Sequence, residues 1–292
     1  MRHIKKYSQL FENQQELTQE QKDWLDKSVD KGSFSSWKLN QQTGLVDVDG
    51  GFDCSGQSLT DLRGVRFGDV VGDFNCSKNS LTSLDGAPRK VGGDFYCHDS
   101  FLTSLEGAPQ SVGGYFDCSE NSLTSLEGAP REIGGDFVCN DSQLVSLKGA
   151  PQKVGEDFDC SGNQLTSLKG APQKVNGYFN CENNQITSLE GAPQIVDGNF
   201  YCEKNQITSL EGVPQEVDGY FYFSGNPISE DAIMDIIQTM HDSRITLEEA
   251  VSECWSDLED EDKLYLAKHN PDLSPEEKRE YAALERHKKR LI

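Results

Sequence analysis

The stretch that decides the fold is FDCSENSLTSLEGAPREIGGD, residues 116–136, because it recurs every 21 residues through the middle of the chain. Each copy carries a phenylalanine two residues before a cysteine, two leucine or isoleucine positions after it, and then a valine or isoleucine. The phenylalanines are Phe52, Phe74, Phe95, Phe116, Phe137, Phe158, Phe179, Phe200 and Phe221. In the ninth copy Phe223 replaces the cysteine, which is suited to closing the core at the end of the array. Because a single copy cannot bury its own apolar face, we expect the copies to stack as coils.

The spacing within a copy predicts the local structure. Phenylalanine and cysteine two residues apart lie on the same side of an extended segment, which predicts a short strand. The asparagine three residues after each cysteine, as at Asn121, is expected to point inward and to bond backbone groups of the turning chain. Ser100 and Ser142 occupy this position in two coils. The Gly-Ala-Pro sequence is a poor helix and a poor central strand, so the return side should be extended or polyproline-like.

The nine cysteines of the chain could suggest disulfides or a metal site. Their spacing argues against both, because eight of them recur once per coil and none forms a C-x-x-C pair. The eight are Cys54, Cys76, Cys97, Cys118, Cys139, Cys160, Cys181 and Cys202. A free cysteine behaves as a small apolar residue. We therefore predict reduced cysteines buried in the core, with no metal and no cofactor.

The pattern F-x-C-x-x-N-x-L-x-x-L resembles the leucine-rich repeat, with phenylalanine and cysteine in two of the leucine positions. Its length and proline are similar to the short repeats of bacterial effector proteins, and the L-T-S-L-x-G-A-P variant resembles repeat proteins of large tailed phages. The resemblance covers residues 51–228 and implies a leucine-rich-repeat solenoid, with a parallel sheet of short strands. Such repeats mostly provide binding surfaces, so the resemblance implies partner binding.

The flanking segments differ from the repeats. Residues 13–50 predict a helix and a β-hairpin that would cover the first coil, with Leu17, Trp24 and Leu25 on the apolar side of the helix. Residues 229–292 contain three segments with helix-start signals, so we expect an acidic helical C-terminal region. Residues 1–12 are basic and aromatic, and resemble the capsid-targeting peptides of T-even-like phages that are cut after a Leu-x-Glu motif. A plain N-terminal tail is the alternative.

Composition limits the possible partners. The net charge is −22, which disfavours nucleic acid and anionic membranes because both require basic surfaces. We found no apolar run of membrane-spanning length and no secretory signal, and we expect a cytoplasmic protein, located in the host cytoplasm if a phage encodes it. Virion packaging through residues 1–12 is possible, and the oligomeric state is open.

No nucleophile, base and orienting acid occur together at a recognisable spacing, so we expect no catalytic residues and no enzyme. Cys254 is the one cysteine outside the repeating column. Some bacterial repeat effectors carry a cysteine ubiquitin ligase after their repeats, with a Cys-x-Asp motif. Here Asp257 is one position too far from Cys254, so this ligase reading is the least favoured.

The residues beside the inward phenylalanine and cysteine should face outward, on a sheet we expect to be concave. Acids are concentrated in the middle coils and tyrosines toward the end, so we predict binding of a protein with a basic surface. Carbohydrate or small-ligand binding through the tyrosines is the alternative, and solubilising residues on an open sheet are the simplest explanation. The candidate partner-binding residues are Asp94, Tyr96, His98, Tyr115, Asp117, Asp136, Asp157, Asp159, Tyr178, Glu182, Tyr201, Glu203, Tyr220 and Tyr222.

Overall fold

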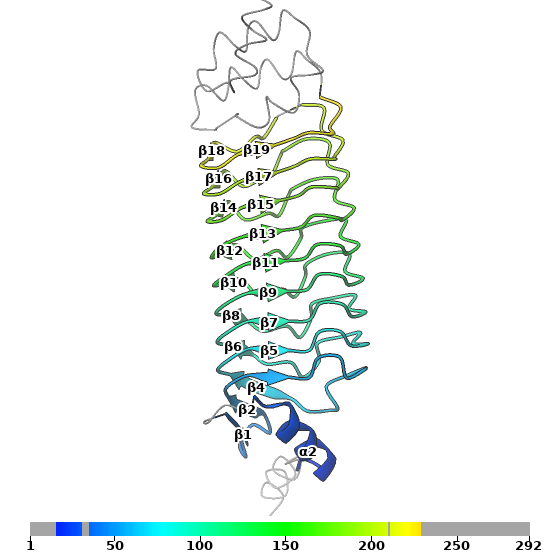
Figure 1. The fold of residues 1–292 in the computed structure, drawn as a ribbon, viewed down its shortest axis with the longest axis vertical. Coiled ribbons are helices and arrows are strands. Elements are labelled where there is room, and N and C mark those ends of the chain that lie inside the picture. The colour runs from blue at the N-terminus through cyan, green and yellow to red at the C-terminus, as the bar shows by residue number, and fades with distance from the viewer. Residues whose placement is uncertain (1–15, 31–34, 210, 229–292) are drawn as a thin grey trace, which may run out of the picture. The chain divides into compact units, whose positions relative to one another are not determined.

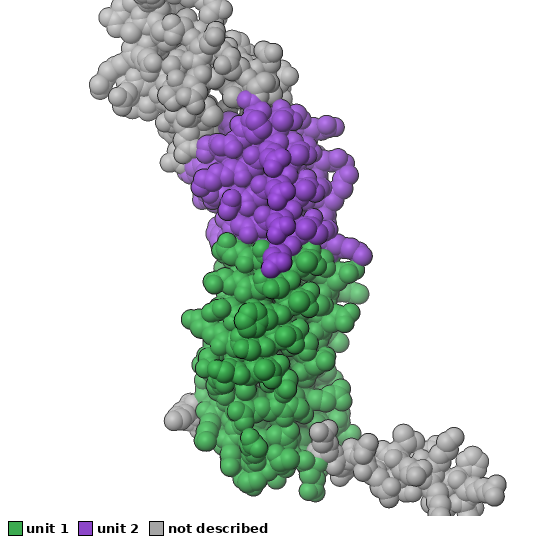
Figure 2. Space-filling view, turned by 90° about the vertical axis from the view of Figure 1, so that its right-hand side faces the viewer, with its two compact units in different colours: residues 1–142, 149–151 green, residues 143–148, 152–292 purple. Residues whose placement is uncertain are grey.

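A computed structural model describes residues 16–30, 35–209 and 211–228 of the chain. Contacts divide it into two compact units, coloured separately in Figure 2. Unit 1 comprises residues up to 142 together with 149–151, and unit 2 comprises residues 143–148 together with those from 152 onward. The predicted targeting tail (1–12) and C-terminal helical region (229–292), including Cys254, lie outside the described residues.

Both units are parallel solenoids of the leucine-rich-repeat type, in which each coil contributes one strand carrying the phenylalanine (Figure 1). Successive strands pair in parallel with phenylalanine opposite phenylalanine, as Phe95 pairs with Phe116. In unit 1 these strands are β3 (Phe52–Asp53), β5 (Phe74–Asn75), β7 (Phe95–Tyr96), β9 (Phe116–Asp117) and β11 (Phe137–Val138). In unit 2 they are β13 (Phe158–Asp159), β15 (Phe179–Asn180), β17 (Phe200–Tyr201) and β19 (Phe221–Tyr222).

The phenylalanine rings form the centre of each core. The rings of Phe95 and Phe116 stack with centroids 5.2 Å apart in unit 1, and those of Phe200 and Phe221 stack 5.0 Å apart in unit 2. All of these rings are buried. Burying each one contributes on the order of 2–3 kcal/mol, so the column explains how a chain with few apolar residues folds.

The return side is extended, as predicted, but it also forms strands, which the Gly-Ala-Pro sequence did not suggest. The strands of unit 1 are β4 (Phe67–Val70), β6 (Lys90–Val91), β8 (Ser111–Val112) and β10 (Glu132–Ile133). Those of unit 2 are β12 (Lys153–Val154), β14 (Lys174–Val175), β16 (Ile195–Val196) and β18 (Glu216–Val217). In every return strand after β4 a proline lies just before the strand, as Pro109 precedes β8, so it removes no donor from the ladder. Successive return strands pair in parallel, for example β6 with β8 and β14 with β16.

The glycine of Gly-Ala-Pro is required by the backbone. Gly128 has a φ of 95°, in the region that side chains other than hydrogen disfavour. A Cβ atom on Gly128 would lie 2.5 Å from the backbone nitrogen of Glu106 in the preceding coil. The coils could not approach this closely with any larger residue here.

The inward asparagines behave as predicted. The Asn121 side-chain amide donates to the backbone oxygens of Cys97, Cys118 and Ser119 at 3.0–3.1 Å, and its Oδ1 accepts from the Leu102 amide at 2.9 Å. In unit 2, Asn205 bonds the corresponding groups of its own and the preceding coil. In the coil where Ser100 replaces the asparagine, the shorter side chain accepts one hydrogen bond, from the backbone amide of Asn79 to Ser100 Oγ at 3.4 Å. Each asparagine therefore joins two consecutive coils.

The eight cysteines of the column are free and buried, as predicted. Four of the thiols donate to a backbone oxygen of the next coil, for example Cys181 Sγ to the Tyr201 oxygen at 3.2 Å. Burial raises the pKa of the Cys76 thiol from 9.0 to about 12. It also raises the pKa of Cys54, Cys97, Cys118, Cys160, Cys181 and Cys202. These thiols are therefore neutral packing groups and weak donors rather than nucleophiles.

The N-terminal segment packs on the first coil of unit 1. Helix α2 (Gln19–Ser28) begins with a capping box formed by Thr18 and Gln21. Trp24 lies edge-on to Phe52, with ring centroids 5.3 Å apart. The hairpin of β1 (Ser36–Leu39) and β2 (Val46–Asp49) joins the return sheet, because β2 pairs in parallel with β4. The first coil is thus contacted on both of its sheets.

Candidate functional site

Three outward columns flank the buried phenylalanines and cysteines in each unit, and we call the columns of a unit its outward face. The leading column, directly before each phenylalanine, contains Gly51, Asp73, Asp94, Tyr115 and Asp136 in unit 1, and Asp157, Tyr178, Asn199 and Tyr220 in unit 2. The middle column, between phenylalanine and cysteine, contains Asp53, Asn75, Tyr96, Asp117 and Val138 in unit 1, and Asp159, Asn180, Tyr201 and Tyr222 in unit 2. The trailing column, directly after each cysteine position, contains Ser55, Ser77, His98, Ser119 and Asn140 in unit 1, and Ser161, Glu182, Glu203 and Ser224 in unit 2.

The carboxylates of the leading column bond the backbone of the next coil, a role that sequence analysis missed. Asp94 Oδ1 accepts from the Tyr115 amide at 2.8 Å, and Asp157 Oδ1 accepts from the Tyr178 amide at 2.7 Å. Asn199 does the same for the Tyr220 amide at 2.9 Å. The sequence does carry a signal for this role, because a glycine precedes each backbone amide that donates to one of these side chains. The glycine leaves room for the acceptor: the Asp94 oxygen occupies the place where a Cβ on Gly114 would stand.

The middle and trailing columns form a second structural motif, Asx-Cys-Ser. The Ser119 amide and hydroxyl both donate to Asp117 Oδ1, at 3.0 and 2.6 Å. Asn75 accepts from Ser77 in the same way, at 3.1 and 2.7 Å. Asp159 and Ser161 repeat the motif in unit 2. In these coils the polar groups satisfy one another, which orients the carboxylates but leaves fewer lone pairs for a partner.

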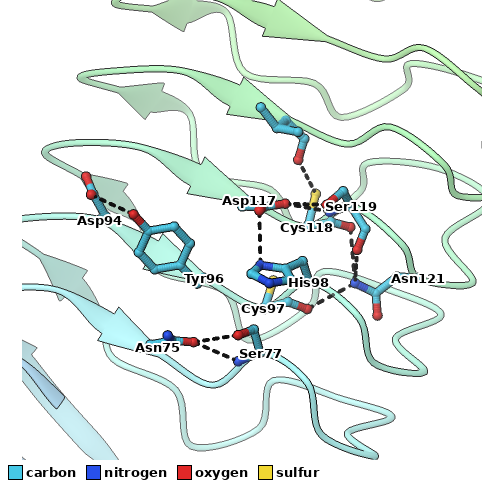
Figure 3. A network of polar contacts seen from close by, with 11 residues as sticks. Asn75, Ser77, Asp94, Tyr96, Cys97, His98, Asp117, Cys118, Ser119 and Asn121 are labelled. Atoms are coloured by element: carbon cyan, nitrogen blue, oxygen red, sulfur yellow. Dashed lines mark hydrogen bonds and ion pairs between the residues drawn. The ribbon is translucent and has the colours of Figure 1, made fainter. Parts of the chain in front are cut away.

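Departures from this motif mark where the outward face is specialised. In unit 1 the coil of β7 has Tyr96 and His98 in place of the Asx and serine (Figure 3). Tyr96 donates its hydroxyl to Asp94 Oδ2 at 2.9 Å, and His98 Nδ1 lies 3.0 Å from Asp117 Oδ2. Tyr115 lies against Tyr96, with ring centroids 5.6 Å apart. Partial burial, the bond to Asp94 and the neighbouring carboxylates raise the pKa of Tyr96 to about 12, so its hydroxyl stays neutral.

Ser119, Asp117 and His98 are in contact, but their order does not provide catalysis. The serine hydroxyl donates to the aspartate, and the histidine lies on the other oxygen of that same aspartate (Figure 3). A nucleophilic serine needs the histidine next to its own hydroxyl. Within the described part of the chain, no group of three or more histidine, cysteine or acidic residues is placed to hold a metal. The arrangement is therefore suited to presenting polar groups rather than to a reaction.

In unit 2 the specialised residues are mostly tyrosines. The rings of Tyr201 and Tyr222 stack 4.8 Å apart with an interplanar angle of 2°, and the Tyr178 ring lies at 81° to Tyr201 with centroids 6.0 Å apart. The ring centroids of Tyr220 and Tyr222 are 6.0 Å apart. Tyr220 is 38% exposed, more than any other tyrosine that the structure describes. Asn199 donates its amide to the Tyr201 hydroxyl at 2.7 Å.

Two predicted acids lie in the trailing column beside these rings. Glu182 accepts from Lys204 Nζ at 2.7 Å, which raises the pKa of that lysine. Glu203 follows Cys202 and is half-buried. Asp136 is half-buried in the leading column of unit 1. The predicted residues thus form two sets, one in each unit. Unit 1 holds carboxylates with Tyr96, His98 and Tyr115, and unit 2 holds the remaining tyrosines with Asp157, Asp159, Glu182 and Glu203.

The comparisons with known proteins add little to this geometry. No family model and no curated protein matches the chain. Among solved structures it is similar to YopM from Yersinia enterocolitica WA-314, with 16% identity and a TM-score of 0.33, over 62% of this chain and 61% of that one. In the described residues no helix has the length and apolar character needed to cross a membrane. Assignment to the leucine-rich-repeat type therefore rests on the coils themselves: short parallel strands, inward apolar columns and an asparagine that joins successive coils.

Proposed function

We propose that the chain is a non-enzymatic protein-interaction module whose outward face binds a partner with a basic surface. The observation that carries this proposal is the charge of the face. Its columns contain nine carboxylates and no lysine or arginine, counted over the residues named above. Lys78 and Lys204 come one position later, in the turn after the trailing column, and Lys90, Lys153 and Lys174 lie on the return strands.

The fixed geometry of the carboxylates supports recognition. Asp94, Asp159 and the buried Asp117 are held by backbone and hydroxyl donors before any partner arrives, so little side-chain entropy is lost on binding. Carboxylates of one sign steer a basic partner and speed its association. Tyrosines beside them contribute large contact areas with few rotatable bonds. A charged, pre-ordered face with aromatic anchors fits a protein partner.

The structure also provides variants that test this proposal without damaging the fold. Asn199 occupies the leading column and Asn75 the middle column, and both accept the same bonds as aspartate there. Replacing Asp94, Asp117 and Asp159 by asparagine therefore removes charge and retains the acceptor. As a matched control, Lys90→Gln and Lys174→Gln remove charge from the return strands.

Affinity capture from host lysate at low and high salt, followed by quantitative mass spectrometry, compares these chains. We expect one or more basic proteins to be retained by the native chain and the lysine variants, and lost with the asparagine variants or at high salt. Retention of the same proteins by the asparagine variants, with unchanged circular dichroism, would contradict the proposal.

Carbohydrate binding through the tyrosines has less support. Apolar C–H groups of sugars pack on the faces of aromatic rings. Tyr201 and Tyr222 cover one face of each other, since they stack 4.8 Å apart and nearly parallel. A glycan array hit abolished by Tyr201→Ala and Tyr222→Ala would reverse this preference.

The resemblance to phage and effector repeats leads us to propose that the partner is a host protein and that the chain acts as an effector or inhibitor. Residues 10–12 read Leu-Phe-Glu, the type of motif cut in phage capsid-targeting peptides. Purified virions containing a chain that begins at Asn13 would support packaging. An intact N-terminus in virions, or no protein there, would contradict it.

A further inference from the structure

We propose that the outward face of unit 2 binds a proline-rich segment in the polyproline II conformation that carries arginine or lysine. The proposed site consists of Tyr178, Asn199 and Tyr220 in the leading column and Tyr201 and Tyr222 in the middle column, flanked by Glu203. This inference rests on the proposed function, because it names the kind of protein segment that the same face takes.

The spacing of the tyrosines matches this ligand. Tyr178 and Tyr220 occupy the same column two coils apart, on either side of Asn199. Adjacent strands of a sheet are about 4.8 Å apart, so these two positions are separated by roughly 9.6 Å. A polyproline II helix repeats every three residues, which span about 9.3 Å. Every third residue of such a segment, aligned with the column, therefore meets a tyrosine. A β-strand ligand, which repeats every two residues or about 6.7 Å, would not stay in register.

A proline ring of the ligand would pack over the side chain between the two tyrosines. Asn199 is shorter than tyrosine, and it is held in place because its Oδ1 accepts from the Tyr220 amide and its Nδ2 donates to the Tyr201 hydroxyl. Tyr178 and Tyr201 lie at 81° to each other, so they form two walls at a right angle beside it. Surfaces lined by aromatic side chains bind polyproline segments well because the ligand is already ordered.

Hydrogen bonding supports the same ligand. A polyproline II helix makes no internal hydrogen bonds, so its backbone oxygens need donors. The Tyr201 oxygen accepts from Asn199, which leaves its own hydroxyl proton to donate to another group. A peptide backbone oxygen above Tyr201 would accept that proton. Prolines have no amide hydrogen and need no acceptor from the face.

Charge selects among proline-rich segments. The outward face of unit 2 contains Asp157, Asp159, Glu182 and Glu203 and no lysine or arginine. Glu182 is paired with Lys204, and Glu203 lies two residues after Tyr201 in the trailing column. An arginine or lysine beside the prolines complements these carboxylates, whereas an acidic proline-rich segment is repelled.

The test is a fluorescence anisotropy titration of the full chain with a fluorescein-labelled peptide of four Arg-Pro-Pro repeats at 0.15 M salt. A peptide of four Arg-Gly-Gly repeats has the same charge without the polyproline II preference, and a peptide of four Glu-Pro-Pro repeats has the opposite charge. We expect saturable binding of Arg-Pro-Pro, with at least tenfold weaker binding of both controls. Tyr220→Ala should weaken Arg-Pro-Pro binding at least tenfold, while the exposed control Thr187→Ala, outside the three columns, should leave it unchanged.

Equal binding of Arg-Pro-Pro and Arg-Gly-Gly, no binding of Arg-Pro-Pro, or no effect of Tyr220→Ala overturns the polyproline inference. None of these results affects the proposed function, which stands or falls on protein capture by the aspartate-to-asparagine variants. If those variants capture the same proteins as the native chain while Tyr220→Ala still loses the peptide, the general charge-based proposal fails and the polyproline site remains.

Discussion

The substitution Asn121→Ala tests how the coils are held together. The native side chain makes four hydrogen bonds, donating to three backbone oxygens and accepting from the Leu102 amide, over distances of 2.9–3.1 Å. A buried hydrogen bond contributes a net of about 1 kcal/mol, so losing the four should lower the free energy of unfolding by about 4 kcal/mol. The matched control is Asn140→Ala, because Asn140 lies on the outward face and bonds only Asp141 by its side chain among the bonds described.

Two measurements test this loss of stability. Urea denaturation followed by circular dichroism gives the overall loss, which should be large for Asn121→Ala and within about 0.5 kcal/mol for Asn140→Ala. Amide hydrogen exchange gives the local loss: the Leu102 amide should exchange up to about a thousandfold faster, since each 1.4 kcal/mol is a factor of ten. The Leu165 amide, bonded to Asn184 in unit 2, is the internal reference. A loss below about 1 kcal/mol, or an unchanged Leu102 amide, would refute the role assigned to the inward asparagines.

Four further predictions follow from the same coils. Iodoacetamide at pH 8 should leave the column cysteines of the native chain unlabelled and should label all of them in urea, as measured by peptide mass spectrometry. Labelling of Cys76 in the folded chain would contradict its burial. Because folding raises the pKa of Cys76 from 9.0 to about 12, its stabilising effect is full below pH 9 and is lost as the pH rises toward 12. The free energy of unfolding measured in urea should therefore fall through this range by up to about 1.4 kcal/mol per pH unit. Gly128→Ala should lower the free energy of unfolding by at least about 2 kcal/mol in thermal unfolding, because the added Cβ meets the backbone of the preceding coil. A loss under about 0.5 kcal/mol, which is typical of surface substitutions, would contradict the close contact between the two coils. Glu120→Gly should raise the free energy of unfolding by about 0.5 kcal/mol, because Glu120 has a φ of 52° at the position that Gly162 occupies in another coil. A fall in the unfolding midpoint would show that the substitution relieves no strain.

The core of this fold was predictable because its signals are periodic. Phenylalanine and cysteine two residues apart predicted the inward side of a strand, and recurrence every 21 residues predicted stacking. The same recurrence explained the cysteines without disulfides, and the structure confirmed that they are free. The inward role of Asn121 followed from the need to pair the backbone groups of a turning chain.

The return sheet was not predicted, because strands of two residues, such as Ser111–Val112, are too short to show an alternating pattern. The role of the aspartates was missed for a different reason. An outward aspartate such as Asp94 has the composition of a solvated surface, and only its proximity to the Tyr115 amide of the next coil reveals a structural bond. The contact of His98 with Asp117 likewise depends on which columns become neighbours between coils. The residues proposed for binding on such a face are those at which the Asx-Cys-Ser motif is broken.

The central claim is that a partner protein binds the outward face. Photo-crosslinking tests it most directly, with benzoylphenylalanine placed at Tyr96 or Tyr201 on this face and at Lys90 or Lys174 on the return strands. We expect crosslinks to a basic protein from Tyr96 or Tyr201 and none from the return strands. Crosslinks from the return strands alone, or none from Tyr96 and Tyr201 in a chain that still captures its partner, would contradict the claim.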